Sequence, residues 1–224
     1  MRVDVNGRKI ELEPNSKPYL LKRIAADGAD IFLVFALFLL FTLLLLKTPL
    51  ADTYHAHFER YKAIEAETAA QLGNDAAAVS SALSRNEEYR GEVFAANLHS
   101  YLIKAAAGFL AELLLLLAIP LANKSRATPG KLMTGIMPFS EKRQSRATPL
   151  QLIGRFVFVL LIDSLALYLY TGILTFLLVP LVRLIELLLS KKKNKTICDF
   201  ITGVMMIEKL SYDGINSFQG GEIR

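Results

Sequence analysis

The longest apolar run of the chain extends from Leu150 to Leu189 and reads LQLIGRFVFVLLIDSLALYLYTGILTFLLVPLVRLIELLL. A helix needs about 20 apolar residues to cross the hydrocarbon layer of a bilayer, so this run is long enough for two spans. Tyrosines, a threonine and a glycine between Tyr168 and Gly172 combine interfacial side chains with weak helix propensity, and we expect a tight turn there. The alternative is one long tilted helix that is kinked at Pro180.

Two further apolar stretches lie upstream, at residues 20–46 and 98–122. The basic residues orient these spans, because Lys and Arg are enriched in cytoplasmic loops. One basic segment precedes the long apolar run and another follows it; three spans would put them on opposite faces of the membrane, whereas four spans put both in the cytoplasm. The first segment contains Lys124, Arg126, Lys131, Lys142, Arg143 and Arg146, and the second contains Lys191, Lys192, Lys193 and Lys195.

We therefore expect an all-α membrane protein, a four-helix transmembrane bundle with a helical extracytoplasmic insertion between spans 1 and 2. It would be a multi-pass protein of the cell inner (cytoplasmic) membrane with both termini cytoplasmic. No internal repeat is evident. The expected segments are a cytoplasmic N-terminal segment (1–19), span 1 (20–46), the extracytoplasmic helical segment (47–97), span 2 (98–122), a cytoplasmic loop (123–149), span 3 (150–169), span 4 (171–190) and a cytoplasmic tail (191–224).

Two of the polar segments have recognisable local patterns. In the N-terminal segment, polar and apolar residues alternate on either side of Asn6-Gly7, a pattern typical of a two-residue β-hairpin turn. The extracytoplasmic segment is rich in alanine and glutamate and predicts helices at Thr53–Leu72 and Asp75–Leu83, separated by Gly73-Asn74. The second of these helices could continue towards span 2 through Glu87–Asn97.

Composition excludes several classes of function. The net charge of +5 comes from basic residues beside apolar spans, so membrane topology explains it better than nucleic acid does. Cys198 is the only cysteine, which excludes an internal disulfide and a multi-cysteine metal centre. His55, His57 and Glu59 lack a further nearby His or Cys and make a poor zinc site. No nucleophile elbow, zinc-protease or dinucleotide motif is present, so we expect neither an enzyme nor a cofactor or metal site.

Ionisable residues inside the spans carry the functional signal, because each costs roughly 2.5–3.5 kcal/mol at the centre of a bilayer on insertion scales. Arg23, Asp27 and Asp30 are spaced so that they share one face of the first helix. The topology places these three in the cytoplasmic half, and we expect a buried polar cluster there. Its other expected members are Arg155, Arg183 and Glu186. The structural alternative is a set of ion pairs that only fixes helix register.

Three carboxylates are candidates for binding an ion or a proton: Asp30, Glu112 and Asp163. Asp30 would lie about 10 Å inside the cytoplasmic boundary, too deep for its short side chain to reach water. Glu112 and Asp163 fall near the middle of their spans, where the sequence offers no opposite charge. Protonation or a cation would be needed to neutralise such a group if it had no partner.

Several short motifs in the right order resemble those of the RDD family of bacterial integral membrane proteins, which is named for one arginine and two aspartates. Arg23 and Asp30 match the arginine and first aspartate at the first helix, and Asp199, in Thr196–Gly203, looks like the second. Arg155 matches an arginine at the entry of the following span. The loop residues Thr128, Gly130, Lys131 and Gly135 look like the family's Thr-Pro-Gly-Lys and later Gly. Thr-Pro-Gly-Lys is not a phosphate-binding loop, and we expect it to turn the chain at the membrane surface.

The resemblance implies a membrane fold and, for some members of the family, cation/proton exchange. Together with the intramembrane carboxylates it favours a small membrane transporter or cation/proton exchanger. The alternative is a non-transporting scaffold or accessory subunit that docks a partner protein. The expected partners are the lipid bilayer, with anionic headgroups near Lys191–Lys195, and a second copy of the chain or another membrane protein.

Overall fold

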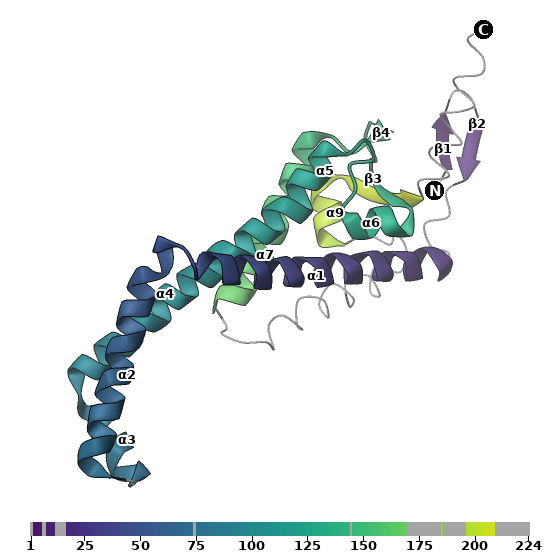
Figure 1. Ribbon diagram of the computed structural model, residues 1–224. Helices are drawn as coiled ribbons and strands as arrows, with labels where there is room; N and C mark the ends of the chain where they lie inside the picture. Colours follow the sequence, from purple (N-terminus) through teal and green to yellow (C-terminus); the bar gives the residue numbers. More distant parts are fainter. Residues whose placement is uncertain are drawn as a thin grey trace. The chain divides into compact units, whose positions relative to one another are not determined.

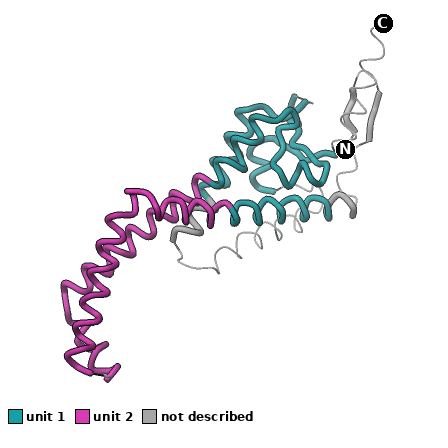
Figure 2. The backbone as a smooth tube through the Cα atoms, viewed as in Figure 1, with its two compact units in different colours: residues 1–36, 111–224 teal, residues 37–110 magenta. Residues whose placement is uncertain are grey.

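The computed structural model describes residues 2–5, 8–11, 17–73, 75–143, 145–169, 185 and 196–208. It divides into two compact units, residues 1–36 with 111–224 and residues 37–110, which are coloured separately in Figure 2. Each unit is described by itself below. The predicted fourth span, residues 171–190, and its charged residues Arg183 and Glu186 lie outside the described residues, apart from the helical residue Ile185.

Helices make up most of the described chain (Figure 1). Helix α1 is Lys17–Leu45, and α4 (Glu87–Glu112) continues through a π-helical segment, η2 (Leu113–Ala118), into α5 (Ile119–Ala122). Among the described residues, two helical stretches are long and apolar enough to cross a membrane, residues 20–45 and 87–122. The first matches predicted span 1 and the second contains predicted span 2; residues 87–97 are helical as expected, but they belong to α4 and are separated from α3 by Asn86. The apolar helix α7 is Pro149–Leu169.

The first unit contains a small sheet that the sequence analysis did not predict. Strands β3 (Ile136–Ser140), β4 (Ser145–Arg146) and β5 (Val204–Glu208) pair antiparallel in the order β4-β3-β5. The expected loop at 123–149 and tail at 191–224 thus contain strands that were not predicted. The physical reason is burial on both faces: β3 is buried throughout and β5 nearly so, which removes the polar–apolar alternation that would have revealed a strand.

Both faces of this sheet are packed. On one face Ile136, Val204 and Met206 form a core with Ala26 of α1 and Leu152 of α7, which Ala147 completes. The other face buries Met137, Phe139, Met205 and Ile207 with Ala127. The sheet thus joins two segments 68 residues apart in sequence and packs them against the start of α1 and of α7.

The two segments that form this core are copies of one motif. Thr128-Pro-Gly-Lys-Leu-Met-Thr-Gly-Ile-Met and Thr196-Ile-Cys-Asp-Phe-Ile-Thr-Gly-Val-Met share Thr, Thr-Gly and Met at the same positions. Each folds as a threonine, a six-residue helix and a glycine with positive φ followed by a strand. The helices are α6 (Pro129–Thr134) and α9 (Ile197–Thr202), and the glycines Gly135 and Gly203 have φ of 70° and 64°.

The pairing of β3 with β5 gives the two copies a local two-fold relation. Pro138 lies directly opposite Met206, its own equivalent in the second copy, so an axis between these two residues exchanges the strands. The expectation that the chain contains no internal repeat is therefore wrong. The copies differ at most positions, including Lys131 against Asp199, and the segment of residues 47–97 lengthens only the first half, so no fixed period spans the chain.

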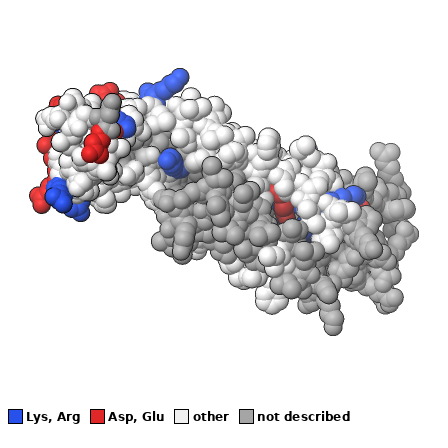
Figure 3. Space-filling view, turned by 90° about the horizontal axis from the view of Figure 1, so that it is seen from below, with Lys and Arg blue, Asp and Glu red and all other residues white. Residues whose placement is uncertain are grey.

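The second unit is helical. A 3₁₀ turn, η1 (Pro49–Ala51), leads into α2 (Asp52–Leu72), and α3 (Ala76–Arg85) follows after Gly73, whose φ is 67°. The Asp75 carboxylate caps α3 by accepting hydrogen bonds from the amides of Ala77 and Ala78. These helices match the predicted pair. Figure 3 shows charged side chains gathered on this unit, where they come mainly from α2 and the first residues of α4, since α3 carries only Arg85.

Strands β1 (Arg2–Val5) and β2 (Arg8–Glu11) pair antiparallel, with Val5 opposite Arg8. This pairing agrees with the predicted hairpin, although the turn residues Asn6 and Gly7 themselves are not among the described residues.

Candidate functional site

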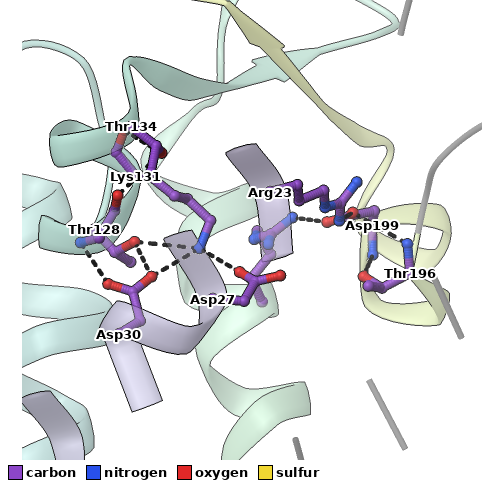
Figure 4. A network of polar contacts seen from close by, with 10 residues as sticks. Arg23, Asp27, Asp30, Thr128, Lys131, Thr134, Thr196 and Asp199 are labelled. Carbon is purple, nitrogen blue, oxygen red and sulfur yellow. Dashed lines mark hydrogen bonds and ion pairs between the residues drawn. The ribbon is translucent and has the colours of Figure 1, made fainter. Parts of the chain in front are cut away.

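Helix α1 presents three charged residues on one face, and two of them are almost fully buried (Figure 4). Arg23 is 1% exposed and Asp30 is 4% exposed. Asp27 lies between them at partial exposure. The partners of these side chains come from α6 and α9, and Arg155 of α7 joins them through Asp199. They form two clusters that we call the lysine cluster (Asp27, Asp30, Thr128, Lys131) and the aspartate cluster (Arg23, Arg155, Asp199).

In the lysine cluster, Asp30 binds the beginning of α6. Its carboxylate accepts hydrogen bonds from the Thr128 hydroxyl, from the Gly130 amide at 2.7 Å and from the Lys131 ammonium at 3.0 Å. Thr128 precedes α6 without capping it by its own side chain. The amides in the first turn of a helix have no partner within the helix. Asp30 of α1 therefore supplies the acceptor that α6 lacks at its N-terminus.

Gly130 lets α6 approach α1 this closely. A Cβ atom at this position would lie 2.2 Å from the Ala26 carbonyl oxygen and 2.8 Å from Asp30 Oδ1. Both distances are shorter than real contacts allow, and one of the two atoms belongs to the backbone. Glycine is thus required by the packing of the two helices and not by the backbone conformation, since Gly130 lies in a regular helical turn.

Three oxygen atoms converge on the Lys131 ammonium. Its Nζ lies 3.0 Å from Asp30 Oδ2, 3.1 Å from Asp27 Oδ1 and 3.2 Å from Thr128 Oγ1. Burial by itself would lower the pKa of Lys131, but the negative charges of Asp30 and Asp27 outweigh it and the pKa is raised. Lys131 is therefore charged at neutral pH, and because it is only 7% exposed, the motif also supplies a buried cation besides the turn that was predicted for it.

In the aspartate cluster, Asp199 is completely buried between two arginines. Its carboxylate accepts hydrogen bonds from Arg23 Nη2 and Arg155 Nη1. It also forms a capping box with Thr196, whose amide donates to Asp199 Oδ2 at 3.2 Å. Burial by itself would raise the pKa of Asp199, but Arg155 and Arg23 outweigh it and the pKa is lowered. Asp199 is thus an anion at neutral pH and joins α9 to α1 and α7.

The two clusters follow the repeat. Lys131 and Asp199 are the third residues of α6 and α9, so equivalent positions carry opposite charges. Arg23 and Arg155 are also equivalent, because each is the seventh residue of its helix, α1 or α7. The predicted polar cluster of Arg23, Asp27, Asp30 and Arg155 does assemble, but its charges pair with Lys131 and Asp199 outside the predicted spans. The sequence signal that could have indicated this pairing is the similarity of the two Thr-Gly motifs, which puts Lys131 and Asp199 at equivalent positions.

The remaining candidates lie elsewhere. Glu112 is buried, 6% exposed, and is the last residue of α4 before the π-helical segment. Asp163 lies in α7, but its side chain is outside the description. His57 Nδ1 lies 2.6 Å from Glu92 and His55 contacts the Leu46 carbonyl, so the two histidines have separate partners. Within the described residues, no three His, Cys, Asp or Glu side chains converge on a point where a metal ion would fit.

Comparison with known proteins identifies the chain at the level of a family. The family model named RDD family matches residues 17–203, which include both charge clusters, the first copy of the repeat and the second copy as far as Gly203. Neither the comparison with curated proteins nor the one with solved structures gives a match. Because the matched residues cover most of the chain, this protein belongs to the RDD family.

Proposed function

We propose that the protein is a small membrane transporter that exchanges a monovalent cation or a proton, with the lysine cluster as its cation-responsive element. The observation that carries this proposal is the set of three oxygens, from Asp27, Asp30 and Thr128, around the buried Lys131 ammonium. Carboxylate and hydroxyl oxygens are also the ligands that alkali and alkaline-earth cations prefer.

Lys131 acts in this proposal as a tethered cation. It occupies the oxygen set when no free cation is bound, and its withdrawal would leave the carboxylates of Asp27 and Asp30 for a cation or a proton. A free cation would bind the state in which Lys131 has withdrawn and not the state in which Lys131 fills the oxygen set. A ligand can drive a conformational change only through such a difference in affinity between two states. Withdrawal would also disturb the beginning of α6, because Gly130, the residue before Lys131, donates its amide to the same carboxylate.

Glu112 and Asp163 are the further carboxylates of the proposed route. Glu112 is buried at the junction between α4 and η2, and π-helical segments occur frequently at functional sites. A route through the protein needs groups that can gain and lose charge at several depths, and the sequence places Glu112 and Asp163 near the middle of their spans.

Ion-driven pH changes in proteoliposomes test the proposal. A sodium or potassium gradient should drive a pH change with the native protein, and the triple variant Asp30→Asn, Glu112→Gln, Asp163→Asn should abolish it. The control is Glu65→Gln, which removes a carboxylate of α2 in the other unit. Equal fluxes for the native protein and the triple variant would rule the proposal out.

A second experiment isolates the role of Lys131. In Lys131→Gln the oxygen set loses its ammonium, so the variant should unfold at a lower temperature in choline chloride and recover in sodium or potassium chloride of the same ionic strength. Choline is too large to enter the site and supplies only screening. The native protein should show little difference between the salts; an equally small difference for Lys131→Gln would argue against a cation taking the place of the ammonium.

The scaffold alternative rests on the second unit. Residues 37–110 form a compact helical unit with charged side chains on α2 and on the start of α4, which is suited to contact a partner in water. If deletion of residues 52–97 abolished co-purification of a partner protein while the first unit stayed folded, and if no ion flux were found, the scaffold function would replace the transporter.

A further inference from the structure

We infer that α6 and α9 are lipid-contacting helices of the cytoplasmic membrane surface, whose outer residues insert among anionic phospholipids while their inner residues hold the charge clusters. This inference rests on the proposed membrane topology, and it assigns a ligand surface to the repeat. The surface consists of Leu132 and Met133 on α6 and of Phe200 and Ile201 on α9.

The two helices have the same pattern of exposure. In each, the second and third residues are buried, as Gly130 and Lys131 in α6 and as Cys198 and Asp199 in α9. The fourth and fifth residues are large, apolar and exposed: Leu132 by 40%, Met133 by 77%, Phe200 by 71% and Ile201 by 61%. An isolated exposed apolar residue needs no explanation, but a pair at the same place in both copies indicates one common apolar environment.

A membrane surface provides such an environment. The local two-fold axis between β3 and β5 exchanges α6 with α9. If this axis runs along the membrane normal, as it must when both halves begin and end in the cytoplasm, both apolar pairs lie at the same depth. A planar lipid surface contacts two sites at equal depth, whereas a single asymmetric protein partner has no reason to recognise both.

The neighbouring residues also favour lipid. α6 begins seven residues after the end of α5 at Ala122, and α7 begins with an exposed Leu150 (76%). Lys124, Lys142 and Arg143 in the same loop are exposed. Apolar side chains beside exposed basic ones are typical of segments that bind the interface of a membrane containing anionic lipids.

The inference links lipid contact to the charge clusters. Because each helix has only six residues, the side chains that enter the lipid and those that bind α1 are neighbours in sequence, such as Lys131 with Leu132 and Asp199 with Phe200. Displacing α6 or α9 from the lipid would therefore move Lys131 or Asp199. Lipid composition should then affect the Lys131 salt bridges that the proposed transport cycle uses and the Asp199 salt bridges that hold α9.

Tryptophan fluorescence tests the inference, because the native chain has no tryptophan. Met133→Trp and Phe200→Trp would report on the two helices, and Ile201→Trp replaces Phe200→Trp if that variant does not fold. The purified variants are reconstituted into vesicles of phosphatidylcholine and phosphatidylglycerol, with and without bromine on the acyl chains. Leu39→Trp on α1 serves as a control for a membrane span, and Leu72→Trp on α2 as a control for water exposure; both positions are exposed.

We expect Met133→Trp and Phe200→Trp to lose fluorescence to lipids brominated near the glycerol end and to resist acrylamide, whereas Leu72→Trp should do the opposite. Three results would overturn the inference: acrylamide quenches both reporters, lipid quenches only one of them, or neither quencher reaches either reporter. The last result would indicate that protein covers the two helices. Leu39→Trp separates the premises: if it is not quenched by deeply brominated lipid, the membrane topology itself fails, and the inference with it.

Discussion

At the scale of the residue, Asp199 is a buried carboxylate that depends on two arginines for its neutralisation. It is fully buried, and its carboxylate accepts hydrogen bonds from two arginines and from the Thr196 amide. Two positive charges meet at this one acceptor. Removing it would leave both arginines in a buried site without their shared anion.

Asp199→Asn should therefore destabilise the protein strongly. Removing one partner of a buried ion pair costs about 3–5 kcal/mol, because the remaining charge loses its compensation. The measurement is thermal or denaturant unfolding in detergent, with Glu67→Gln as a control that removes an exposed carboxylate of α2 in the other unit. A loss no larger than that of the control would show that the arginines find other partners.

The contribution of Asp199 to stability should depend on pH in a defined direction. Its pKa is lowered below the ordinary value of 3.8, so the folded state binds the proton less well than the unfolded state does. The stabilisation is therefore fully present above pH 3.8 and is lost as the pH falls through the lower pKa of the folded state. The difference in unfolding free energy between the native protein and Asp199→Asn should be constant from about pH 5 to about pH 8 and shrink only in stronger acid. A difference that shrank near neutral pH would contradict this.

Gly130→Ala tests the close approach of α6 to α1. The added methyl group would meet the Ala26 carbonyl oxygen at 2.2 Å, so α6 would have to move away from Asp30. Overpacking of this kind costs about 1–3 kcal/mol, and the loss of the Asp30 hydrogen bonds adds to it. Gly28→Ala on α1 is the matched control, because nothing lies within 4 Å of its Cβ position and alanine favours a helix over glycine by up to about 1 kcal/mol. Unfolding temperatures should fall for the first variant and stay equal or rise for the second.

At the scale of the element, the two copies of the repeat use the same scaffold with different chemistry. α9 is capped by its own threonine and aspartate, whereas α6 receives its cap from Asp30 of α1. In both copies a glycine with positive φ ends the helix and turns the chain into a strand. The repeat thus holds the start of α1 from two directions, through Lys131 on one side and Asp199 on the other.

Thr196→Ala tests the cap of α9. The variant loses the hydroxyl that accepts the Asp199 amide at 3.2 Å, and loss of such a cap costs about 0.5–2 kcal/mol. Thr196→Ser keeps the hydroxyl and should restore most of the stability in the same unfolding measurement. If serine were no better than alanine, the threonine methyl group and not the capping box would account for the effect.

At the scale of the whole molecule, the proposed topology predicts opposite accessibility for the two units. In a Cys198→Ser background, a cysteine in place of the exposed Lys142 should react with a membrane-impermeant thiol reagent only from the cytoplasmic side. A cysteine in place of the exposed Glu67 should react only from the outer side. The assay uses intact cells and inverted vesicles. Labelling of both positions from the same side would exclude an odd number of spans between them and with it the proposed topology.

The sequence by itself was sufficient for the features that depend on composition along the chain. Three features could be predicted because long apolar runs, helix formers and ordered motifs are local signals: two helices long and apolar enough to cross a membrane, the helices on either side of Gly73-Asn74, and the RDD family. The same signals indicated that Arg23, Asp27, Asp30 and Arg155 lie together, since three of them share one face of a single helix.

Only the tertiary structure decided which charges pair and that the connecting segments form a sheet. Lys131 is 101 residues from Asp30, and Asp199 is 176 residues from Arg23, so no local pattern reports these contacts. β3 and β5 are buried on both faces and lack the alternation of an ordinary strand. Their pairing brings two diverged copies of one motif around a common axis, and this places one buried lysine and one buried aspartate against the charges of α1.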